Sequence, residues 1–269
     1  MSEEPRAGRF AGRIALVTGS TQGLGATLLH RLADEGLAGA VVTGRSRERG
    51  AAVVESLAAK GCDAIFVPAD LCDAGSVAAI VPAATDRFGV IDHLANCAAL
   101  TSRGDVWDTT TDLFDEMMAV NVRAPFQLIQ AVAILARTGG RPASVVNVGS
   151  MAAHGGAPFI TPYSISKGAL AVMTRTTAFQ LMHDRVRVVQ VNPGWMDTPG
   201  EDAVQREFHN ATDGWLERVE AERPFGRLIK TDELAATLAF VLSDEAGMMT
   251  GAVIDYDQTV LGAGDVDTA

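Results

Sequence analysis

The chain has 269 residues, 48% of them hydrophobic and 20% charged, and a net charge of −11. This balance argues against a disordered chain, and the length is compatible with one domain that buries a substantial core. The acidic charge disfavours nonspecific binding to nucleic acid or to an anionic membrane, since it repels both, and it favours small soluble substrates.

Residues 1–12 form the first segment, which we expect to be a flexible tail. The segment is polar and lacks the apolar stretch of a signal peptide, and no later apolar run approaches the length of a membrane span. The three cysteines, Cys62, Cys72 and Cys97, lack C-x-x-C spacing, so we predict neither a disulfide framework nor a metal site. We therefore expect small buried thiols in a cytoplasmic protein.

The first structural unit combines an apolar run of strand length, residues 13–18, with a glycine-rich turn and a helical pattern. Glycines let the backbone turn tightly and let a pyrophosphate approach the amide groups at the helix N-terminus, where partial positive charge favours an anion. The spacing G-x-x-x-G-x-G differs from G-x-G-x-x-G, and no G-K-[ST] follows, so the turn is not a Walker A loop. The residues predicted to bind here are Gly19, Thr21, Gln22, Gly23, Leu24 and Gly25.

Residues 38–43 are predicted to form a second strand, which ends at Gly44-Arg45-Ser46-Arg47. In a dinucleotide fold, the end of this strand meets the adenosine ribose, where an acid binds the 2′-hydroxyl and an arginine binds a 2′-phosphate. No acid precedes Glu48, so Arg45 favours NADP(H). The alternative is NAD(H), with Arg45 as a solvated loop charge.

Two further strands are predicted at residues 63–68 and 91–95. Polar and small residues follow both, at the edge where open parallel sheets bind ligands. For Asp70, a helix cap near Asp73 is the alternative. The residues expected at this edge are Asp70, Leu71, Asn96 and Ala98. The alternation of strands and helices with short turns predicts an α/β fold with a doubly wound parallel sheet.

The second half of the chain contains a predicted long helix over residues 112–137, interrupted around Asn121 and Pro125, because proline removes a backbone donor. Three more strands are predicted at residues 143–148, 185–191 and 251–255. We expect a seven-stranded, mostly parallel sheet with helices on both faces, in a single domain spanning residues 1–269.

The stretch from Ser150 to Lys167 holds the most reactive pair in the sequence. Tyr163 and Lys167 are four residues apart and follow Pro162 at the expected helix start, so they share one helix face. A tyrosine titrates near pH 10, and a nearby ammonium lowers that value by stabilising the phenolate. On this spacing alone, a surface Tyr/Lys pair is the alternative.

Residues 200–225 are predicted to form a substrate lid, as a pair of helices or a mobile segment. They combine hydrogen-bonding groups with an aromatic ring, which suits a sugar or polyol, although a solvated exterior is the alternative. The candidate substrate residues are Ser150, His154, Trp195, His209 and Trp215.

Taken in order, these motifs resemble the short-chain dehydrogenase/reductase family over nearly the whole chain. Six segments carry the resemblance: the cofactor loop Thr18-Gly19-x-x-x-Gly23-x-Gly25, the segment Asn96-Cys97-Ala98-Ala99, the helix residue Asn121, Ser150 thirteen residues before Tyr163, the pair Tyr163-x-x-x-Lys167, and the nicotinamide-side loop Pro193-Gly194-x-x-x-Thr198. Cys97 and Ala99 depart from the family's N-N-A-G pattern. Gln22 stands where many NADP-using members have a basic residue.

The resemblance implies a Rossmann-type fold and an enzyme that transfers a hydride between a nicotinamide cofactor and a secondary alcohol or ketone. Tyr163 would exchange the hydroxyl proton, Ser150 would bind the substrate oxygen, and Lys167 would lower the tyrosine pKa and bind the ribose. Asn121 would hold a water that joins Lys167 to solvent. The other cofactor contacts implied are Arg45, Asp70, Leu71, Asn96, Ala98, Pro193, Gly194, Met196 and Thr198.

Two other functions stay open. A 3-oxoacyl-(acyl-carrier-protein) reductase is weakly disfavoured, because the chain's negative charge opposes an acidic carrier. A nonenzymatic NADP-sensing regulator would not need Ser150, Tyr163 and Lys167 together. The resemblance also implies a homo-oligomer, a dimer or tetramer built on the helices over residues 112–137 and 161–183 and on the C-terminal strand.

Overall fold

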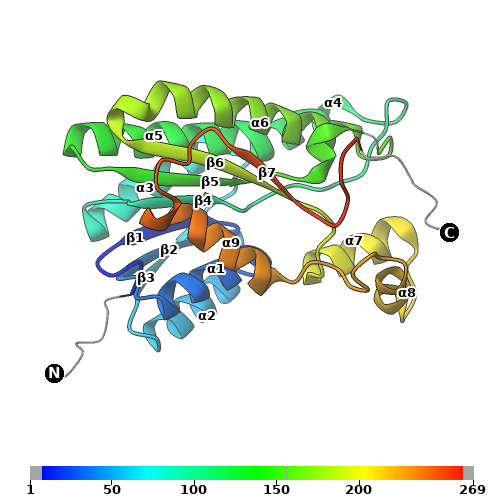
Figure 1. The fold of residues 1–269 in the computed structure, drawn as a ribbon, viewed down its shortest axis with the longest axis horizontal. Coiled ribbons are helices and arrows are strands. Elements are labelled where there is room, and N and C mark those ends of the chain that lie inside the picture. Colours follow the sequence, from blue (N-terminus) through cyan, green and yellow to red (C-terminus); the bar gives the residue numbers. More distant parts are fainter. Residues whose placement is uncertain (1–7, 156, 263–269) are drawn as a thin grey trace.

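The computed structural model describes residues 8–155 and 157–262, which contain one seven-stranded sheet (Figure 1). The strand order is β3-β2-β1-β4-β5-β6-β7, and every pairing is parallel. The predicted doubly wound α/β fold is therefore confirmed, with a sheet that is wholly parallel. The strands are β1 (Ile14–Thr18), β2 (Gly39–Gly44), β3 (Asp63–Pro68), β4 (His93–Asn96), β5 (Ala143–Val148), β6 (Val186–Pro193) and β7 (Val253–Tyr256).

Helices cover both faces of the sheet and enclose two hydrophobic cores (Figure 1). Side chains alternate along each strand, so Ala15 and Val17 of β1 enter one core, and Leu16 enters the other. The first core includes α1 (Gly23–Asp34), α2 (Arg47–Ala58) and α9 (Thr231–Leu242). The second includes α3 (Ala74–Phe88), α5 (Ala124–Gly139) and α6 (Thr161–Leu181). Short 3₁₀ turns span Met151–His154, Met182–Asp184 and Asp244–Ala246.

The winding direction of the sheet reverses beside β1. The chain moves outward from β1 through β2 to β3 and then returns to β4 on the other side of β1. The carboxyl ends of β1 and β4 are thus neighbours, with Thr18 paired with Asn96. Open parallel sheets bind ligands in the crevice at such a switch point. The topology therefore places a ligand site next to the glycine-rich turn.

The predicted long helix is interrupted where the sequence indicated. α4 (Thr111–Met118) and α5 are joined by a π-helical turn, Ala119–Arg123, which contains Asn121. The combined segment Thr111–Gly139 is long and apolar enough to cross a membrane by length and composition alone. This differs from the expectation that no segment would approach a membrane span. Packed core helices meet the same criterion, and Leu128, Ile129 and Val132 lie in the second core.

The N-terminal segment differs from the expected flexible tail. Residues 1–7 lie outside the described residues, but Phe10 is completely buried and stacks edge-on against His93 at 5.2 Å. The Phe10 amide donates to the Glu35 carbonyl, and the Arg9 guanidinium pairs with the Glu35 carboxylate. The prediction is therefore wrong from residue 8 onward, because a single aromatic side chain closes the end of the first core.

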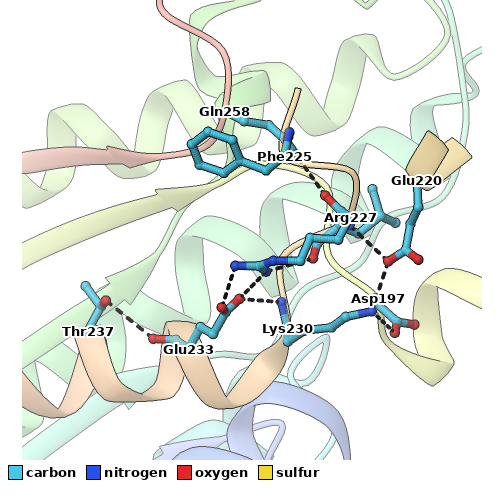
Figure 2. Close-up of polar contacts among 9 residues, drawn as sticks. Asp197, Glu220, Phe225, Arg227, Lys230, Glu233, Thr237 and Gln258 are labelled. Atoms are coloured by element: carbon cyan, nitrogen blue, oxygen red, sulfur yellow. Dashed lines mark hydrogen bonds and ion pairs between the residues drawn. The ribbon is translucent and has the colours of Figure 1, made fainter. Parts of the chain in front are cut away.

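The segment after β6 forms a separate lobe of two helices, α7 (Pro199–His209) and α8 (Trp215–Ala221), seen beside the sheet in Figure 1. The Lys230 ammonium ties its two ends together, since it lies 2.9 Å from the carboxylates of both Asp197 and Glu220 (Figure 2). A second ion pair, between Arg227 and Glu233, fixes the chain where it enters α9 (Figure 2). The predicted pair of helices is confirmed, and its role as a lid stays a prediction.

Candidate active site

One cavity of about 1220 Å³ runs along the carboxyl ends of the strands. The cavity extends from β2, past the glycine-rich turn, to helix α7 and to Arg223 and Pro224, which follow α8. Most residues predicted from the sequence line it: Gly19, Thr21, Gln22, Gly23, Leu24, Gly25, Arg45, Asp70, Leu71, Ala98, Ser150, Tyr163, Lys167, Pro193, Gly194, Trp195, Met196, Thr198 and His209.

The glycine-rich turn lies so close to neighbouring backbone that side chains are excluded. Gly19 has a φ of +64°, and a Cβ there would lie 2.9 Å from the Ala98 Cα. A Cβ on Gly25 would lie 2.7 Å from the Gly19 carbonyl oxygen. The N-cap residue of α1, Gln22, makes no side-chain cap hydrogen bond. The turn and the first amides of α1 are thus suited to receive a pyrophosphate.

The hydroxyls of Thr18 and Ser20 hold this turn in place. The Thr18 Oγ1 accepts hydrogen bonds from the amides of Cys97 and Ala98, at 3.0 and 3.1 Å. The Ser20 Oγ donates to the Val17 carbonyl and accepts from the Thr43 amide. These hydrogen bonds therefore fix the turn to β1, β2 and the segment after β4.

Two arginines line the cavity at the end of β2. Arg45 directly follows the strand, and Arg49 comes from the first turns of α2. The sequence predicted Arg45 but not Arg49, which also lines the cavity, whereas Arg47 does not. Asp70 also lines the cavity, and the alternative that it caps α3 is wrong, because Asp73 accepts the capping hydrogen bonds.

Ser150, Tyr163 and Lys167 come together from two elements. Ser150 lies two residues after the end of β5, and its amide donates to the Asn192 Oδ1 at 3.2 Å. Tyr163 and Lys167 lie in the first turns of α6, where Pro162 begins the helix. The Lys167 ammonium donates to the Val148 carbonyl at 2.8 Å and lies 5.6 Å from the centre of the Tyr163 ring. The structure thus brings together three of the four predicted catalytic side chains, and the fourth is Asn121.

Burial dominates the charge balance of this group. It lowers the pKa of Lys167 to about 8 and raises the pKa of Tyr163 above its usual value of 10, although the Ser150 hydroxyl acts to lower the latter. The net lowering of the tyrosine pKa that the sequence predicted is therefore not present, because burial outweighs the groups that act to lower it. Burial also raises the pKa of Cys97 to about 12, so this residue is a neutral thiol.

Asn96 and Asn121, both predicted to act in the site, are buried outside the cavity lining. The Asn96 Nδ2 donates to the Asn147 Oδ1 at 2.8 Å, which braces β4 against β5. The Asn121 side chain exchanges hydrogen bonds with the backbone of Leu100 and donates to the Ser166 Oγ. It therefore joins the loop after β4 to α6, and its role in holding a water beside Lys167 stays a prediction.

Two predicted substrate residues also lie outside the lining. His154 pairs with Asp255 at 2.9 Å, and the same Asp255 oxygen accepts from Asn192, the residue that binds the Ser150 amide. Trp215 is only 7% exposed and stacks behind Trp195, with ring centres 6.2 Å apart. These predictions are corrected: His154 braces the strand ends, and Trp215 belongs to the core of the lobe.

Sequence reasoning missed part of the cavity wall that faces α7 and α8. Arg103 and Phe159 line it from two loops, and Glu201, Phe208 and Arg223 line it from the lobe. No family motif includes these positions, so only the folded chain brings them together.

The chain matches the family model described as enoyl-(acyl carrier protein) reductase over residues 19–259. An uncharacterised oxidoreductase from Thermotoga maritima is 34% identical, covering 92% of this chain and 97% of the relative. The chain therefore belongs to the short-chain dehydrogenase/reductase family, as its motifs suggested.

Two solved structures resemble the fold closely. L-Sorbose reductase from Gluconobacter frateurii, complexed with NADPH and L-sorbose, superposes with a TM-score of 0.88 at 26% identity, covering 94% of this chain and 98% of that one. NAD⁺-bound xylitol dehydrogenase superposes with a TM-score of 0.83 at 28% identity, covering 91% and 98%. The chain is thus an oxidoreductase whose cofactor class is the nicotinamide dinucleotides, and these relatives differ in which one they bind.

Proposed function

We propose that this protein is an NADP(H)-dependent dehydrogenase/reductase that interconverts a secondary alcohol and a ketone on a small, hydroxyl-rich molecule. The observation that carries the proposal is the convergence of Ser150, Tyr163 and Lys167 on one cavity beside the glycine-rich turn. A binding protein without activity would have no need for all three groups at one point.

The cavity offers a place for each part of the cofactor. The turn around Gly19 and the first amides of α1 would hold the pyrophosphate. Lys167 would bind the nicotinamide ribose, and Thr198 with the backbone after Pro193 would orient the carboxamide. A bound nicotinamide supplies a hydride in reduction and accepts one in oxidation.

Three side chains would carry out the proton transfer: Tyr163, Ser150 and Lys167. The raised pKa of Tyr163 keeps it a neutral phenol near pH 7, which suits proton donation to a carbonyl oxygen. Ser150 would hydrogen-bond the same oxygen and orient it toward the phenol. Lys167 is still mostly an ammonium at neutral pH, so it would stabilise the phenolate that donation leaves.

The preference for NADP(H) rests on the end of β2. Arg45 and Arg49 both line the cavity there, and neither forms an ion pair within the described part of the chain. We expect Arg45→Asp to lower kcat/KM with NADP(H) at least about tenfold while NAD(H) is less affected, because a phosphate contact from arginine is a charge-assisted hydrogen bond. Equal losses with both cofactors would contradict the assignment.

Glu201, Gln205 and His209 give the lobe side of the cavity its hydrogen-bonding capacity, which supports a sugar- or polyol-like substrate. The test is the change in reduced-nicotinamide absorbance with either cofactor against sugars, polyols, secondary alcohols and ketones. We expect turnover of a hydroxylated compound. Tight cofactor binding with no turnover across the panel would instead favour a regulator.

We also propose that the protein is a homo-oligomer. Large apolar side chains are exposed on the outer face of α5 and α6, among them Ile134 at 57%, Val172 at 63% and Phe179 at 76%. Such a surface is typical of an interface between copies. Light scattering should give a mass of two or four chains, and a monomeric mass would contradict this proposal.

A further inference from the structure

The part of the cavity beyond Tyr163 carries two arginines, Arg103 and Arg223, that form no ion pair within residues 8–155 and 157–262. The Arg103 side chain contacts the His209 ring, the Thr101 carbonyl and the Phe159 ring, and within residues 8–155 and 157–262 none of its recorded contacts is a carboxylate. The nearby cavity carboxylate, Glu201, instead accepts hydrogen bonds from Trp195 and Gln205, both at 2.7 Å. Among the described residues, no acid therefore neutralises the charge that Arg103 brings to the cavity.

The backbone fixes Arg103 beside the helix that carries Tyr163. Gly104 and Ile160 form a parallel bridge, in which the Gly104 amide donates to the Phe159 carbonyl and the Thr161 amide donates to the Gly104 carbonyl, each at 3.0 Å. Arg103 therefore lies next to Phe159, and its guanidinium is 5.6 Å from the centre of that ring. The position of this arginine relative to the catalytic helix is set by main-chain bonds.

The hydrogen bonds of Arg103 leave part of its guanidinium available. Nε donates to the His209 Nε2 and Nη1 donates to the Thr101 carbonyl, both at 3.1 Å. Arginine has five N–H donors in a planar fork, and an oxyanion can accept two of them side by side. Nη2 has no recorded acceptor among the described residues, so the fork can still bind an anion in the cavity that Arg103 lines.

Arg103 also lies close enough to influence the reacting centre. Its charge acts to lower the pKa of Tyr163, and the charge of Glu201 acts to raise it. Because Arg103 and Tyr163 line one cavity, a single molecule could place an anion at Arg103 and its hydroxyl or carbonyl at Tyr163. Phe159 and Trp195 would cover the carbon chain between these two points.

We propose that Arg103 is a specificity-determining residue and that the substrate carries an oxyanion, a carboxylate or a phosphate, on the chain that presents its carbinol to Tyr163. This rests on the proposed function for the position of the reacting carbon. The substrate class is thus a hydroxylated acid or phosphate ester rather than a neutral polyol.

A matched series of six-carbon compounds tests the proposal: neutral D-glucitol, D-gluconate with a carboxylate, and D-glucitol 6-phosphate. Affinity is measured by calorimetry with the saturating oxidised cofactor, for the wild type, Arg103→Gln and Arg103→Lys. We expect the wild type to bind at least one anion about tenfold or more tightly than D-glucitol. Arg103→Gln should remove most of this preference, and Arg103→Lys should keep part of it because a point charge remains.

Arg223→Gln is the matched control, because Arg223 lines the same cavity but stacks on the Trp195 ring at 5.3 Å. It should leave the anion preference in place. Thermal unfolding checks that all variants are folded. The proposal would be overturned if the wild type bound the neutral and anionic compounds equally, or if it bound none of the three compounds. It would also be overturned if Arg103→Gln and Arg223→Gln lost the anion preference equally. A loss confined to cofactor affinity would overturn it as well.

The readout separates this inference from the proposed function, since it measures binding and not turnover. An anion preference that depends on Arg103, without any hydride transfer, would contradict the enzyme assignment and leave the inference standing. Turnover of neutral alcohols with no dependence on Arg103 would support the enzyme assignment and contradict the inference about Arg103.

Discussion

The catalytic side of the cavity and its lobe side are held in place by different kinds of interaction. On the catalytic side, Lys167 is 2% exposed and donates to the Val148 carbonyl at the end of β5. Asn192 of β6 is fully buried and accepts from the Ser150 amide. On the lobe side, α7 buries only Gln205 and α8 buries only Trp215. Buried hydrogen bonds therefore fix the positions of the catalytic groups, whereas α7 and α8, with few buried side chains, can open locally.

The lobe depends instead on polar contacts near solvent. Arg206 pairs with Asp202 and with the fully exposed Asp213, and Lys230 joins the two ends of the lobe. Exposed pairs of this kind contribute about 0–1 kcal/mol each. Changes on the catalytic side should therefore affect chemistry strongly, and changes at the lobe should affect substrate binding weakly.

The largest effect is expected at the phenol. Tyr163→Phe removes the phenol that we expect to exchange a proton with the substrate oxygen, so kcat should fall about 10²- to 10⁴-fold. Cofactor affinity should change little, because the glycine-rich turn is untouched. Steady-state kinetics and a cofactor titration measure the two quantities.

Tyr256→Phe is the matched control for this loss, since Tyr256 is the other tyrosine of the chain and lies on β7. It should retain most of the activity. Near-normal turnover in Tyr163→Phe would show that the phenol is not the proton donor.

A second, smaller effect on the catalytic side is a dependence on pH. The pKa of Lys167 is lowered from 10.5 to about 8, so its ammonium is present at neutral pH and is lost as the pH rises through 8. Without that charge, the phenolate formed during reduction is less stable, and kcat/KM for reduction should decline toward about tenfold per pH unit above 8.

Lys167→Met removes the titrating group and should therefore show a low rate without this decline. The measurement is kcat/KM for ketone reduction across neutral to alkaline pH at saturating cofactor. A wild-type profile that stays flat well above pH 8 would separate Lys167 from the proton-transfer step.

The catalytic side was also the part that the sequence predicted well. The seven strands were placed to within about two residues, because buried parallel strands are short apolar runs that end in glycine or polar residues. Ser150, Tyr163 and Lys167 lie on those strand ends or on one helix turn, so local spacing was enough to bring them together.

The lobe side depended on contacts that local spacing does not encode. Arg103 reaches the cavity through a bridge between Gly104 and Ile160, which are far apart in sequence. Trp215 faces inward because it stacks on Trp195. Its helix has only seven residues, which is too short for a helical pattern in the sequence to show which side is buried. The same limit applies to Phe10, a single aromatic residue in a polar segment.

The smallest effect is expected at the base of the lobe. Lys230→Met removes the ammonium shared by Asp197 and Glu220 and leaves two carboxylates near each other, so the two ends of the lobe should separate more readily (Figure 2). We expect KM for substrate to rise a few-fold with kcat nearly unchanged, since the partners are part-exposed and each pair is worth at most about 1 kcal/mol. Hydrogen exchange should accelerate in α7 and α8 and not in α6. The matched control is Lys60→Met, which breaks a surface pair with Asp34 and makes the same change in charge. It should alter neither KM nor the hydrogen exchange of α7 and α8. If both variants behave alike, the loss of positive charge explains the result, and the ion pairs of Lys230 with Asp197 and Glu220 do not. If KM rises only in Lys230→Met, the lobe acts on substrate binding while the catalytic side stays intact.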